Sequence, residues 1–313
     1  MEAAVNYIEN YEYRKLEKLP KNSAKPFLKW AGGKTQLIGE IENNLPIGLK
    51  HGEITKYIEP FVGSGAIFFY LVSKYNIQEV YINDTNKDLI NTYRVIRDDI
   101  EGLINELEEL SKTYSKCNEE EKSKFFYDIR DLYNGNRTNK IKHASYFIFL
   151  NRTCFNGLYR VISKGGFNVP FGKYVNPKIC DEENLRNVSE ILKNIKILNI
   201  DFEDTEKYVD NKTFVYFDPP YRPLNITSNF NSYSKEAFND DTQKKLAEYF
   251  KKLNRIGAKL MLSNSDPKNT DESDNFFDDL YSGFNIKRVN AKRMINSNAS
   301  KRGEITELLI TNY

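Results

Sequence analysis

The sequence predicts an α/β fold, in which a doubly wound, Rossmann-like sheet is interrupted by a mostly helical insertion. Two short apolar segments, residues 57–62 and 214–217, are typical of buried strands, and each ends directly in a turn rich in Gly or Pro. Between them, apolar residues recur at alternating steps of four and three, as on one face of a helix. A chain that leaves a sheet for a helical segment and then returns to it explains this order.

Composition excludes several classes of protein. The chain has 313 residues, 40% of them hydrophobic and 29% charged, which suits two structural units with a substantial core. No apolar run is long enough to cross a membrane, and the N-terminus lacks the apolar segment of a signal peptide, so we expect a cytoplasmic protein. Cys117, Cys154 and Cys180 are odd in number and widely spaced, and with His51 and His143 they form neither a disulfide framework nor a zinc motif. With a net charge of +2, a nucleic-acid partner must be recognised by local patches.

The first part of the chain is predicted as a polar extension, residues 1–24, followed by alternating helices and strands. These elements are a turn at 31–33, a helix from about Thr35, the strand 57–62, a helix at 66–72 and a strand at 79–82.

The turn after the first strand is typical of a ligand site. Gly63-Ser64-Gly65 opens a helix, and glycines there let the backbone approach a ligand at the helix N-terminus. Asp84 follows the next strand, 19 residues after Gly65, a spacing that suits a ribose hydroxyl pair in dinucleotide-binding folds. A helix N-cap is the alternative interpretation of Asp84.

The insertion, residues 88–195, differs in character. Its apolar stripe predicts one helix face packed in a core and consists of Leu89, Tyr93, Ile96, Ile100, Leu103, Leu107 and Leu110. A charged stretch at 112–142 and an apolar helix at 143–150 follow. Residues 151–174 then mix Arg152, Arg160, Lys164 and Lys173 with aromatic residues and four glycines. Such a mixture fits a nucleic-acid recognition surface, or else an ordinary glycine-rich loop.

The apolar segment 214–217 ends in Asp218-Pro219-Pro220-Tyr221. Because two prolines remove two N–H donors, the carbonyls of Asp218 and Pro219 stay available to a substrate. A carboxylate and a carbonyl that accept both N–H bonds of an aromatic amine would stabilise the positive charge that grows on its nitrogen during attack. Tyr221 could stack on the planar base. The alternative is a strand-ending turn without a function. Further strands at 195–200, 259–263, 284–289 and 305–311 complete the predicted sheet.

Taken in order, these motifs resemble the Dam family of DNA adenine-N6 methyltransferases, the D12 class, and particularly the methylases of GATC-specific restriction-modification systems. Residues 27–34, FLKWAGGK, are similar to the family's N-terminal cofactor motif, and residues 59–65, EPFVGSG, to its methionine-binding glycine motif. The resemblance implies S-adenosylmethionine as cofactor. The residues it places at the cofactor are Trp30, Lys34, Glu59, Phe61, Gly63, Ser64, Gly65, Asp84, Asp201, Phe202 and Asp218. It also implies catalytic roles for Asp218, Pro219 and Tyr221.

The same resemblance extends to contacts with double-stranded DNA. Residues 151–152, 156–160 and 167–172 are similar to the family's target-recognition hairpin. By that likeness Arg160 contacts a guanine, Leu158 and Pro170 touch bases, and Phe155 wedges into the space left by a flipped nucleotide. The remaining implied DNA contacts are Lys29, Arg152 and Asn156. The basic loop 294–303 is expected to contact phosphates, or to be only a hairpin connection.

We therefore expect an enzyme that methylates N6 of a flipped adenine in duplex DNA, in GATC, without a metal. Its predicted domains are the extension 1–24, a cofactor-binding catalytic domain from 25–87 and 196–313, and a DNA target-recognition domain at 88–195. A cognate restriction endonuclease could act on the same DNA without a stable complex, and no membrane partner is implied. Two alternatives stay open: an N-methyltransferase acting on RNA adenine or protein glutamine, and a non-catalytic DNA-binding regulator. A phosphoryl-transfer P-loop would need glycine where the chain has Leu28.

Overall fold

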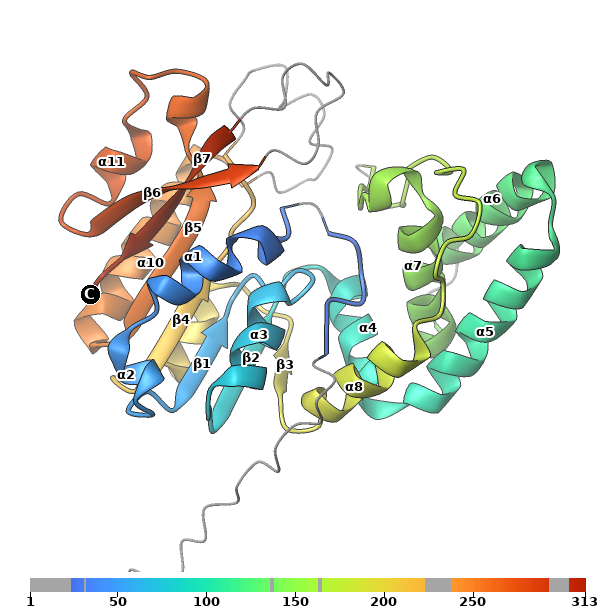
Figure 1. The fold of residues 1–313 in the computed structure, drawn as a ribbon, viewed down its shortest axis with the longest axis horizontal. Coiled ribbons are helices and arrows are strands. Elements are labelled where there is room, and N and C mark those ends of the chain that lie inside the picture. Colours follow the sequence, from blue (N-terminus) through green and yellow to red (C-terminus); the bar gives the residue numbers. More distant parts are fainter. Residues whose placement is uncertain (1–23, 31, 136–137, 163–164, 223–237, 293–303) are drawn as a thin grey trace, which may run out of the picture.

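The computed structural model describes residues 24–30, 32–135, 138–162, 165–222, 238–292 and 304–313 (Figure 1). Three sequence predictions lie outside these ranges: almost all of the polar extension, Lys164 in the recognition surface, and the basic loop 294–303. Ala24, at the end of the predicted extension, is described and buried. Among the described helices, none is long and apolar enough to cross a bilayer.

Within these ranges, seven strands form one sheet in the order β3-β2-β1-β4-β5-β7-β6. The first five in this order are parallel, whereas β7 runs antiparallel to both β5 and β6. The strands are β1 (Lys56–Glu59), β2 (Glu79–Asn83), β3 (Lys196–Leu198), β4 (Thr213–Phe217), β5 (Lys259–Ser265), β6 (Asn285–Lys292) and β7 (Glu304–Thr311). The predicted α/β fold is confirmed. Because the strand order reverses between β1 and β4, the gap beyond their carboxyl ends is where such sheets bind ligands.

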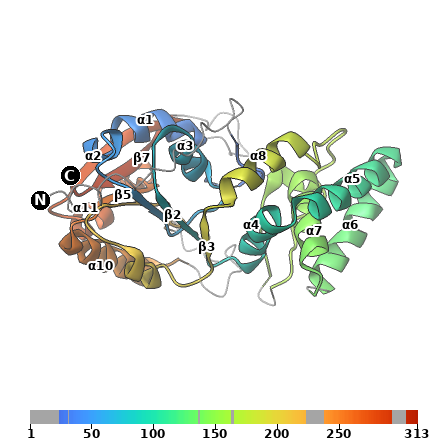
Figure 2. The same ribbon diagram turned by 90° about the horizontal axis from the view of Figure 1, so that it is seen from below.

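Helices cover both faces of the sheet (Figure 2). On one face lie η1 (Lys34–Leu37), α1 (Ile38–Asn43), α2 (Ile47–Lys50) and α3 (Ala66–Lys74), and on the other lie α10 (Asp240–Ile256) and α11 (Phe276–Leu280). The side chains of β4 alternate between them: Phe214 and Tyr216 pack in the core beneath α1 and α3, and Val215 and Phe217 in the core beneath α10. Burial on both faces explains why this strand is a continuous apolar run.

Five further helices stand beside the sheet, and we call this group the helical lobe (Figure 1). They are α4 (Lys87–Asp98), α5 (Ile100–Lys116), α6 (Glu119–Gly135), α7 (Lys140–Thr153) and α8 (Glu182–Leu192). Helix α7 is buried along most of its length, polar residues included, because it packs against α4, α5 and α6.

The apolar stripe belongs to two helices, so the prediction of one helix was wrong. The break falls at Asp99, whose φ of −149° and ψ of 67° are not helical. Its side chain accepts a hydrogen bond from the N–H of Gly102 at 3.0 Å and thereby caps α5. Asp favours such caps over helix interiors, and here that local preference interrupts the period. Apart from Ile100, which is partly exposed, the stripe residues are buried, as core packing requires.

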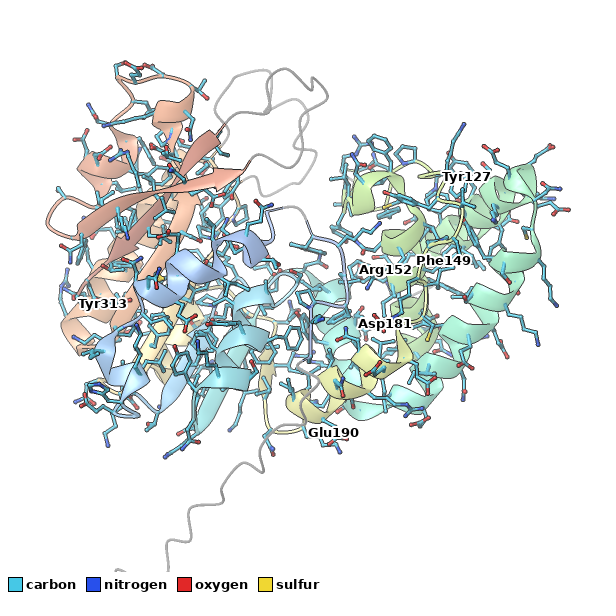
Figure 3. The ribbon with its side chains drawn as sticks, viewed as in Figure 1. Tyr127, Phe149, Arg152, Asp181, Glu190 and Tyr313 are labelled. Atoms are coloured by element: carbon cyan, nitrogen blue, oxygen red, sulfur yellow. The ribbon has the colours of Figure 1, made fainter. Side chains whose placement is uncertain are left out.

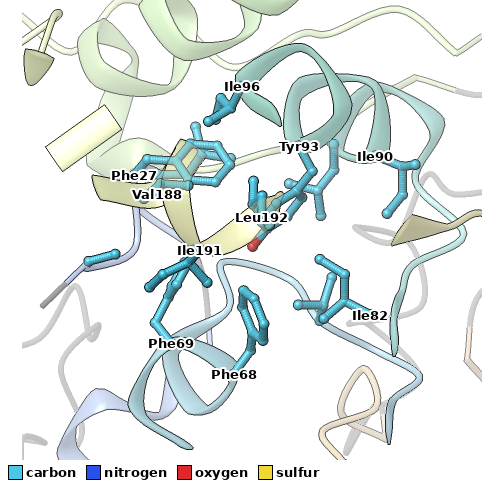
Figure 4. Close-up of a cluster of buried hydrophobic side chains, with 14 of the residues drawn as sticks. Phe27, Phe68, Phe69, Ile82, Ile90, Tyr93, Ile96, Val188, Ile191 and Leu192 are labelled. Atoms are coloured by element: carbon cyan, nitrogen blue, oxygen red, sulfur yellow. The ribbon is translucent and has the colours of Figure 1, made fainter. Parts of the chain in front are cut away.

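A shared apolar cluster joins the helical lobe to the sheet (Figure 4). Phe68 and Phe69 of α3 approach Tyr93 of α4 and Leu192 of α8, while Phe27 packs edge-on against Tyr93 with ring centroids 5.0 Å apart. The segment that carries the FLKWAGGK motif therefore runs between the two parts of the molecule.

Candidate active site

A cavity of about 930 Å³ lies at the carboxyl ends of the parallel strands. Its walls come from the segments that follow β1, β2, β3 and β4, together with Trp30, residues 32–34 and the beginning of α10. The predicted cofactor residues that line it are Trp30, Lys34, Glu59, Phe61, Gly63, Ser64, Asp84, Asp201, Phe202 and Asp218, and the predicted catalytic residues Pro219 and Tyr221 line it as well. Gly65 stands behind the wall, and none of the predicted DNA contacts lines the cavity.

Both glycines of the turn after β1 are required by their surroundings. Gly63 has a φ of 48°, and a Cβ there would lie 3.0 Å from Nε1 of Trp30. Gly65 has a φ of 76°, and its Cβ would lie 2.7 Å from the hydroxyl oxygen of Tyr93. That hydroxyl donates a hydrogen bond to the carbonyl of Gly63 at 3.0 Å. The turn is therefore held from the helical lobe while its other side faces the cavity.

Asp84 fixes the same turn from the end of β2. Its carboxylate accepts hydrogen bonds from the N–H of Gly63 at 3.1 Å and of Asn86 at 2.9 Å. The N-cap of α4 is Asn86, which accepts from the N–H groups of Asp88 and Leu89. The N-cap interpretation of Asp84 was therefore wrong. Burial raises the pKa of Asp84, and the two N–H donors partly oppose that rise.

Glu59, at the end of β1, is only 2% exposed. The hydroxyl of Tyr57 donates to its Oε2 at 2.6 Å. Burial raises the pKa of the Glu59 carboxyl well above its usual value, even though this hydrogen bond lowers it. A cationic ligand in the cavity would favour the ionised form of this carboxyl, and the ionised form would in turn favour the ligand.

An aromatic corner lies beyond the end of β3. The ring of Phe61 lies 5.5 Å from that of Phe202 and 5.6 Å from that of Phe238, centroid to centroid. Asp201 stands at the rim, where its Oδ1 accepts from the N–H of Glu203 at 3.0 Å. Such a corner suits a flat, weakly polar ring.

Lys34 connects the turn at residues 218–221, which we call the catalytic turn after its predicted role, to the antiparallel end of the sheet. Its Nζ lies 3.0 Å from Oδ1 of Asp218, 2.6 Å from the hydroxyl of Tyr221 and 3.3 Å from Oε2 of Glu307 on β7. Burial lowers the pKa of Lys34, but Asp218, Tyr221 and Glu307 outweigh it, so the pKa is raised. For Asp218, burial raises the pKa, Lys34 lowers it and Glu307 raises it, with a raised pKa as the result.

Buried polar side chains hold the catalytic turn from behind. Ser263 Oγ lies 3.3 Å from Oδ1 of Asp218 and 2.8 Å from the hydroxyl of Tyr216. Gln243 of α10 donates to the carbonyl of Pro220 at 3.2 Å. Arg222, the next residue after the turn, donates to Asp240 at 2.7 Å and to Asp274 at 2.6 Å.

The predicted recognition segment forms a short hairpin after α7, which we call the recognition hairpin (residues 154–174). Its paired positions are Cys154 with Phe171 and Val161 with Phe167. Phe155 is 51% exposed, and Pro170 and Asn156 are exposed beside it. Leu158 is partly buried against the core. Arg160 is exposed, and its Nε donates to Asn168 at 2.8 Å.

Lys29 and Arg152 lie where α7 meets the FLKWAGGK segment. Asn151 accepts from the N–H of Lys29 at 2.8 Å and donates to its carbonyl at 2.7 Å, while Lys29 Nζ stands 4.2 Å above the ring of Tyr174. Arg152 points toward the same segment (Figure 3) and donates to the carbonyl of Phe27 at 2.8 Å. Burial lowers the pKa of Arg152. In this structure Arg152 therefore holds the protein main chain.

Residues 30–295 match the sequence profile of the D12 class N6 adenine-specific DNA methyltransferases. The chain belongs to this family. This methyltransferase is 56% identical over 292 residues to the type II methyltransferase M.MjaIII of Methanocaldococcus jannaschii, with 92% of this chain and 99% of the relative covered. It is 41% identical to the type II methyltransferase M1.LlaDCHI of Lactococcus lactis subsp. cremoris, with 94% and 97% covered. It is 32% identical to the DNA adenine methylase of Escherichia coli K12, with 93% and 95% covered.

Several residues of the methyltransferase site were missed by the sequence analysis. Phe238, Asn239, Thr242 and Lys245 line the cavity from the beginning of α10, and Glu307 contacts Lys34 from β7. Asn239 caps α10, and Asn followed by Asp-Asp and an amphipathic run is a helix-start signal that was available. Glu307 had no such signal, because a single acid in an edge hairpin is an ordinary surface residue. Across the part of the chain described, no group of His, Cys, Asp and Glu is placed to hold a metal ion.

Proposed function

We propose that this methyltransferase transfers a methyl group from S-adenosylmethionine to N6 of an adenine flipped out of duplex DNA, within the sequence GATC. The observation that carries the proposal is that the glycine turn, with Asp84, and the catalytic turn, with Asp218, form walls of one cavity. Because both turns line the same cavity, a methyl donor at one and an amine acceptor at the other would be close enough for direct transfer.

The residues present fit the proposed donor. S-Adenosylmethionine carries an ammonium and a sulfonium, and the buried carboxyl of Glu59 suits a cation. Asp84 beside the Gly63 N–H suits the ribose hydroxyls, and the corner of Phe61, Phe202 and Phe238 suits the adenine ring. When bound, the donor supplies a methyl carbon on sulfonium sulfur: the N6 lone pair forms the C–N bond, the C–S bond breaks with its electrons returning to sulfur, and one N6 proton passes to water.

The catalytic turn fits the proposed acceptor. Asp218 and the Pro219 carbonyl accept the two N6–H bonds and stabilise the positive charge that develops on the nitrogen. Tyr221, which is 39% exposed, offers its ring to the base. An adenine within the duplex cannot reach a walled cavity, so the enzyme must flip it out of the stack.

The helical lobe and the recognition hairpin together provide the proposed DNA target-recognition domain, residues 88–195. Phe155, Pro170 and Arg160 are exposed together on the recognition hairpin, as a wedge, a base contact and a guanine ligand require. Lys29, Asn156 and Leu158 adjoin this surface and are proposed as further contacts. The names of the relatives, which include type II methyltransferases and DNA adenine methylases, support action on DNA, with or without a cognate endonuclease that shares the site.

The experiment that tests the function uses plasmid DNA without adenine methylation and S-adenosylmethionine labelled in its methyl group. We expect the label on N6 of adenine in GATC, and none in a plasmid in which these sites are already methylated. The Asp218→Ala variant is the control for adventitious labelling. Label found instead on cytosine, on an RNA adenine or on added protein would contradict the proposal, and the mapped context would correct GATC if adenine elsewhere were labelled.

A further inference from the structure

Glu307 is the second carboxylate of the site, and it comes from the far end of the chain. Its Oε2 lies 3.3 Å from Lys34 Nζ, and its Oε1 accepts from the hydroxyl of Tyr221 at 3.1 Å. Lys34 in turn lies 3.0 Å from Asp218. The side chains of Lys34, Asp218 and Glu307 are 2%, 21% and 12% exposed, so solvent screens their charges little.

The net charge of this cluster determines the electrostatic field at the target amine. Lys34 with Asp218 alone would form a neutral pair, whose field would do little for a positive charge growing on N6. With Glu307 added, one cation faces two carboxylates and the cluster carries a net charge of −1. In a site sheltered from water, a fixed negative charge beside developing positive charge is a large contribution to catalysis.

Asp218 is oriented so that one oxygen stays available. Lys34 Nζ and Ser263 Oγ both approach Oδ1, at 3.0 Å and 3.3 Å. None of the hydrogen bonds and ion pairs among the described residues involves Oδ2. Because Oδ1 takes both contacts, Oδ2 is left to accept from a ligand in the cavity that Asp218 lines.

We propose that Glu307 is a positioning residue that offsets the charge of Lys34, so that Asp218, held through Oδ1 and accepting the N6–H bond at Oδ2, acts within a net-negative cluster. This inference rests on the proposed function. It assigns Lys34 a second role besides lining the cofactor cavity, which is to orient the catalytic carboxylate. Glu307 does not touch the reacting atoms, and it acts through Lys34 and Asp218.

The first test replaces Glu307→Gln, which keeps an oxygen for the Tyr221 hydroxyl and removes the charge. We expect the single-turnover rate at saturating cofactor and DNA to fall about 10-fold or more, below the 10²- to 10³-fold that loss of a direct contact costs. The cofactor Kd from calorimetry and the DNA KM should change less than 3-fold. Glu79→Gln is the matched control, because Glu79 Oε2 also accepts a hydrogen bond from a tyrosine, Tyr81, at 2.9 Å. Glu79 is the first residue of β2, at the end of the strand away from the cavity.

The second test asks whether the charge itself matters. In Lys34→Met/Glu307→Gln the net charge of the cluster returns to −1, with Ser263 still beside Oδ1. At saturating cofactor this double variant should transfer methyl faster than Glu307→Gln alone. If the two losses simply multiply, or if Glu307→Gln keeps the wild-type rate, the inference is overturned. Thermal melting confirms that each variant is folded.

The third test needs no activity. The groups that face Asp218 are Lys34 from η1, Glu307 from β7, Tyr57 and Glu59 from β1, Tyr216 from β4 and Tyr221 from the turn itself. Because Glu307 raises the pKa of Asp218, Glu307→Gln should lower this pKa. In a 13C NMR titration of cofactor-free protein, the midpoint of the Asp218 carboxyl titration should therefore lie at a lower pH in the variant than in wild type. An unshifted titration would overturn the inference. Absence of adenine methylation by the wild type would instead overturn the proposed function, and the two failures are thus distinguished.

Discussion

The indole of Trp30 stacks on the phenol of Tyr159, with ring centroids 5.7 Å apart and planes 17° from parallel. Trp30 lines the cavity, whereas Tyr159 belongs to the recognition hairpin and precedes Arg160. The stack therefore joins the proposed cofactor site to the proposed DNA-recognition surface.

The first prediction follows from this contact. Tyr159→Leu should weaken cofactor binding about 2- to 10-fold, because an aromatic pair contributes roughly 0.5–1.5 kcal/mol beyond its buried area. It should also reduce the gain in DNA affinity that cofactor produces. Calorimetry with and without a GATC duplex measures both effects. Tyr127→Leu, in a tyrosine on α6 that packs on Phe126 far from the cavity (Figure 3), is the control; equal cofactor affinities in the two variants would contradict the prediction.

The second prediction separates chemistry from cofactor binding. Asp218→Ala should reduce the single-turnover rate by about 10² to 10³ or more, since the proposed partner of Asp218 is the amine in the transition state. Asp201→Ala, at the rim of the aromatic corner, should instead raise the cofactor Kd and leave the saturated rate nearly unchanged. Calorimetric titration and rapid-quench assays measure the two quantities. Near-normal turnover in Asp218→Ala would remove this residue from the mechanism.

The third prediction concerns base flipping. Phe155 is 51% exposed and has no polar group, which suits a wedge that offsets an unstacking cost of a few kcal/mol. With 2-aminopurine in place of the target adenine, Phe155→Ala should show a smaller fluorescence increase and a lower transfer rate than wild type. Leu132→Ala, at an apolar residue of α6 that is 50% exposed and so matches Phe155, should show neither change. Identical behaviour of the two variants would mean that Phe155 has no role in flipping.

The fourth prediction contrasts two arginines. Arg160→Ala should relax discrimination at one guanine position by about 1–3 kcal/mol and leave stability unchanged, because the side chain is exposed. Arg152→Ala should lower the melting temperature, because its bond to the carbonyl of Phe27 is partly buried. Values of kcat/KM on GATC and on its three variants at the guanine, at fixed salt, give the ratios. If all rates fell equally in Arg160→Ala, the residue would be a phosphate contact.

The fifth prediction concerns pH. Because burial raises the pKa of Glu59 in the folded state, the folded protein binds this proton more tightly than the unfolded chain does. That contribution to stability is complete below the unfolded pKa of 4.5 and is lost as pH rises. Glu59→Gln should therefore melt at a higher temperature than wild type at pH 8 and by a smaller margin at pH 5, at about 1–2 °C per kcal/mol. A margin that does not depend on pH would show that Glu59 ionises freely in the fold.

Much of the fold was predictable because its signals are local. Strands such as β4 and β5 are short apolar runs that end in turn residues. Such a pattern can be recognised from neighbouring residues alone, without knowledge of what the strand packs against. The break at Asp99 was not predicted, because the period of the stripe continues across it. There the capping preference of one side chain outweighed an amphipathic pattern that seven residues shared.

The candidate site was predictable only where motifs mark it. Glu59, Asp84 and Asp218 lie at the ends of β1, β2 and β4. Because these strands are parallel, their carboxyl ends meet on one side of the sheet, and this brings the three residues together. Glu307 reaches the same side of the sheet because β7 pairs antiparallel to β5, with Ser265 opposite Glu307. No local sequence pattern specifies this pairing. Long-range register therefore supplied the contact that the sequence alone did not reveal.

The alternating burial of β4 has a consequence for how such enzymes can diversify. Every residue of this strand is buried, so no position on it tolerates change without disturbing one core or the other. The recognition hairpin, in contrast, carries exposed residues such as Phe155, Arg160 and Pro170, whose replacement leaves the sheet intact. Altered target specificity is thus most accessible to engineering in the hairpin, with the strand that carries the catalytic turn left unchanged.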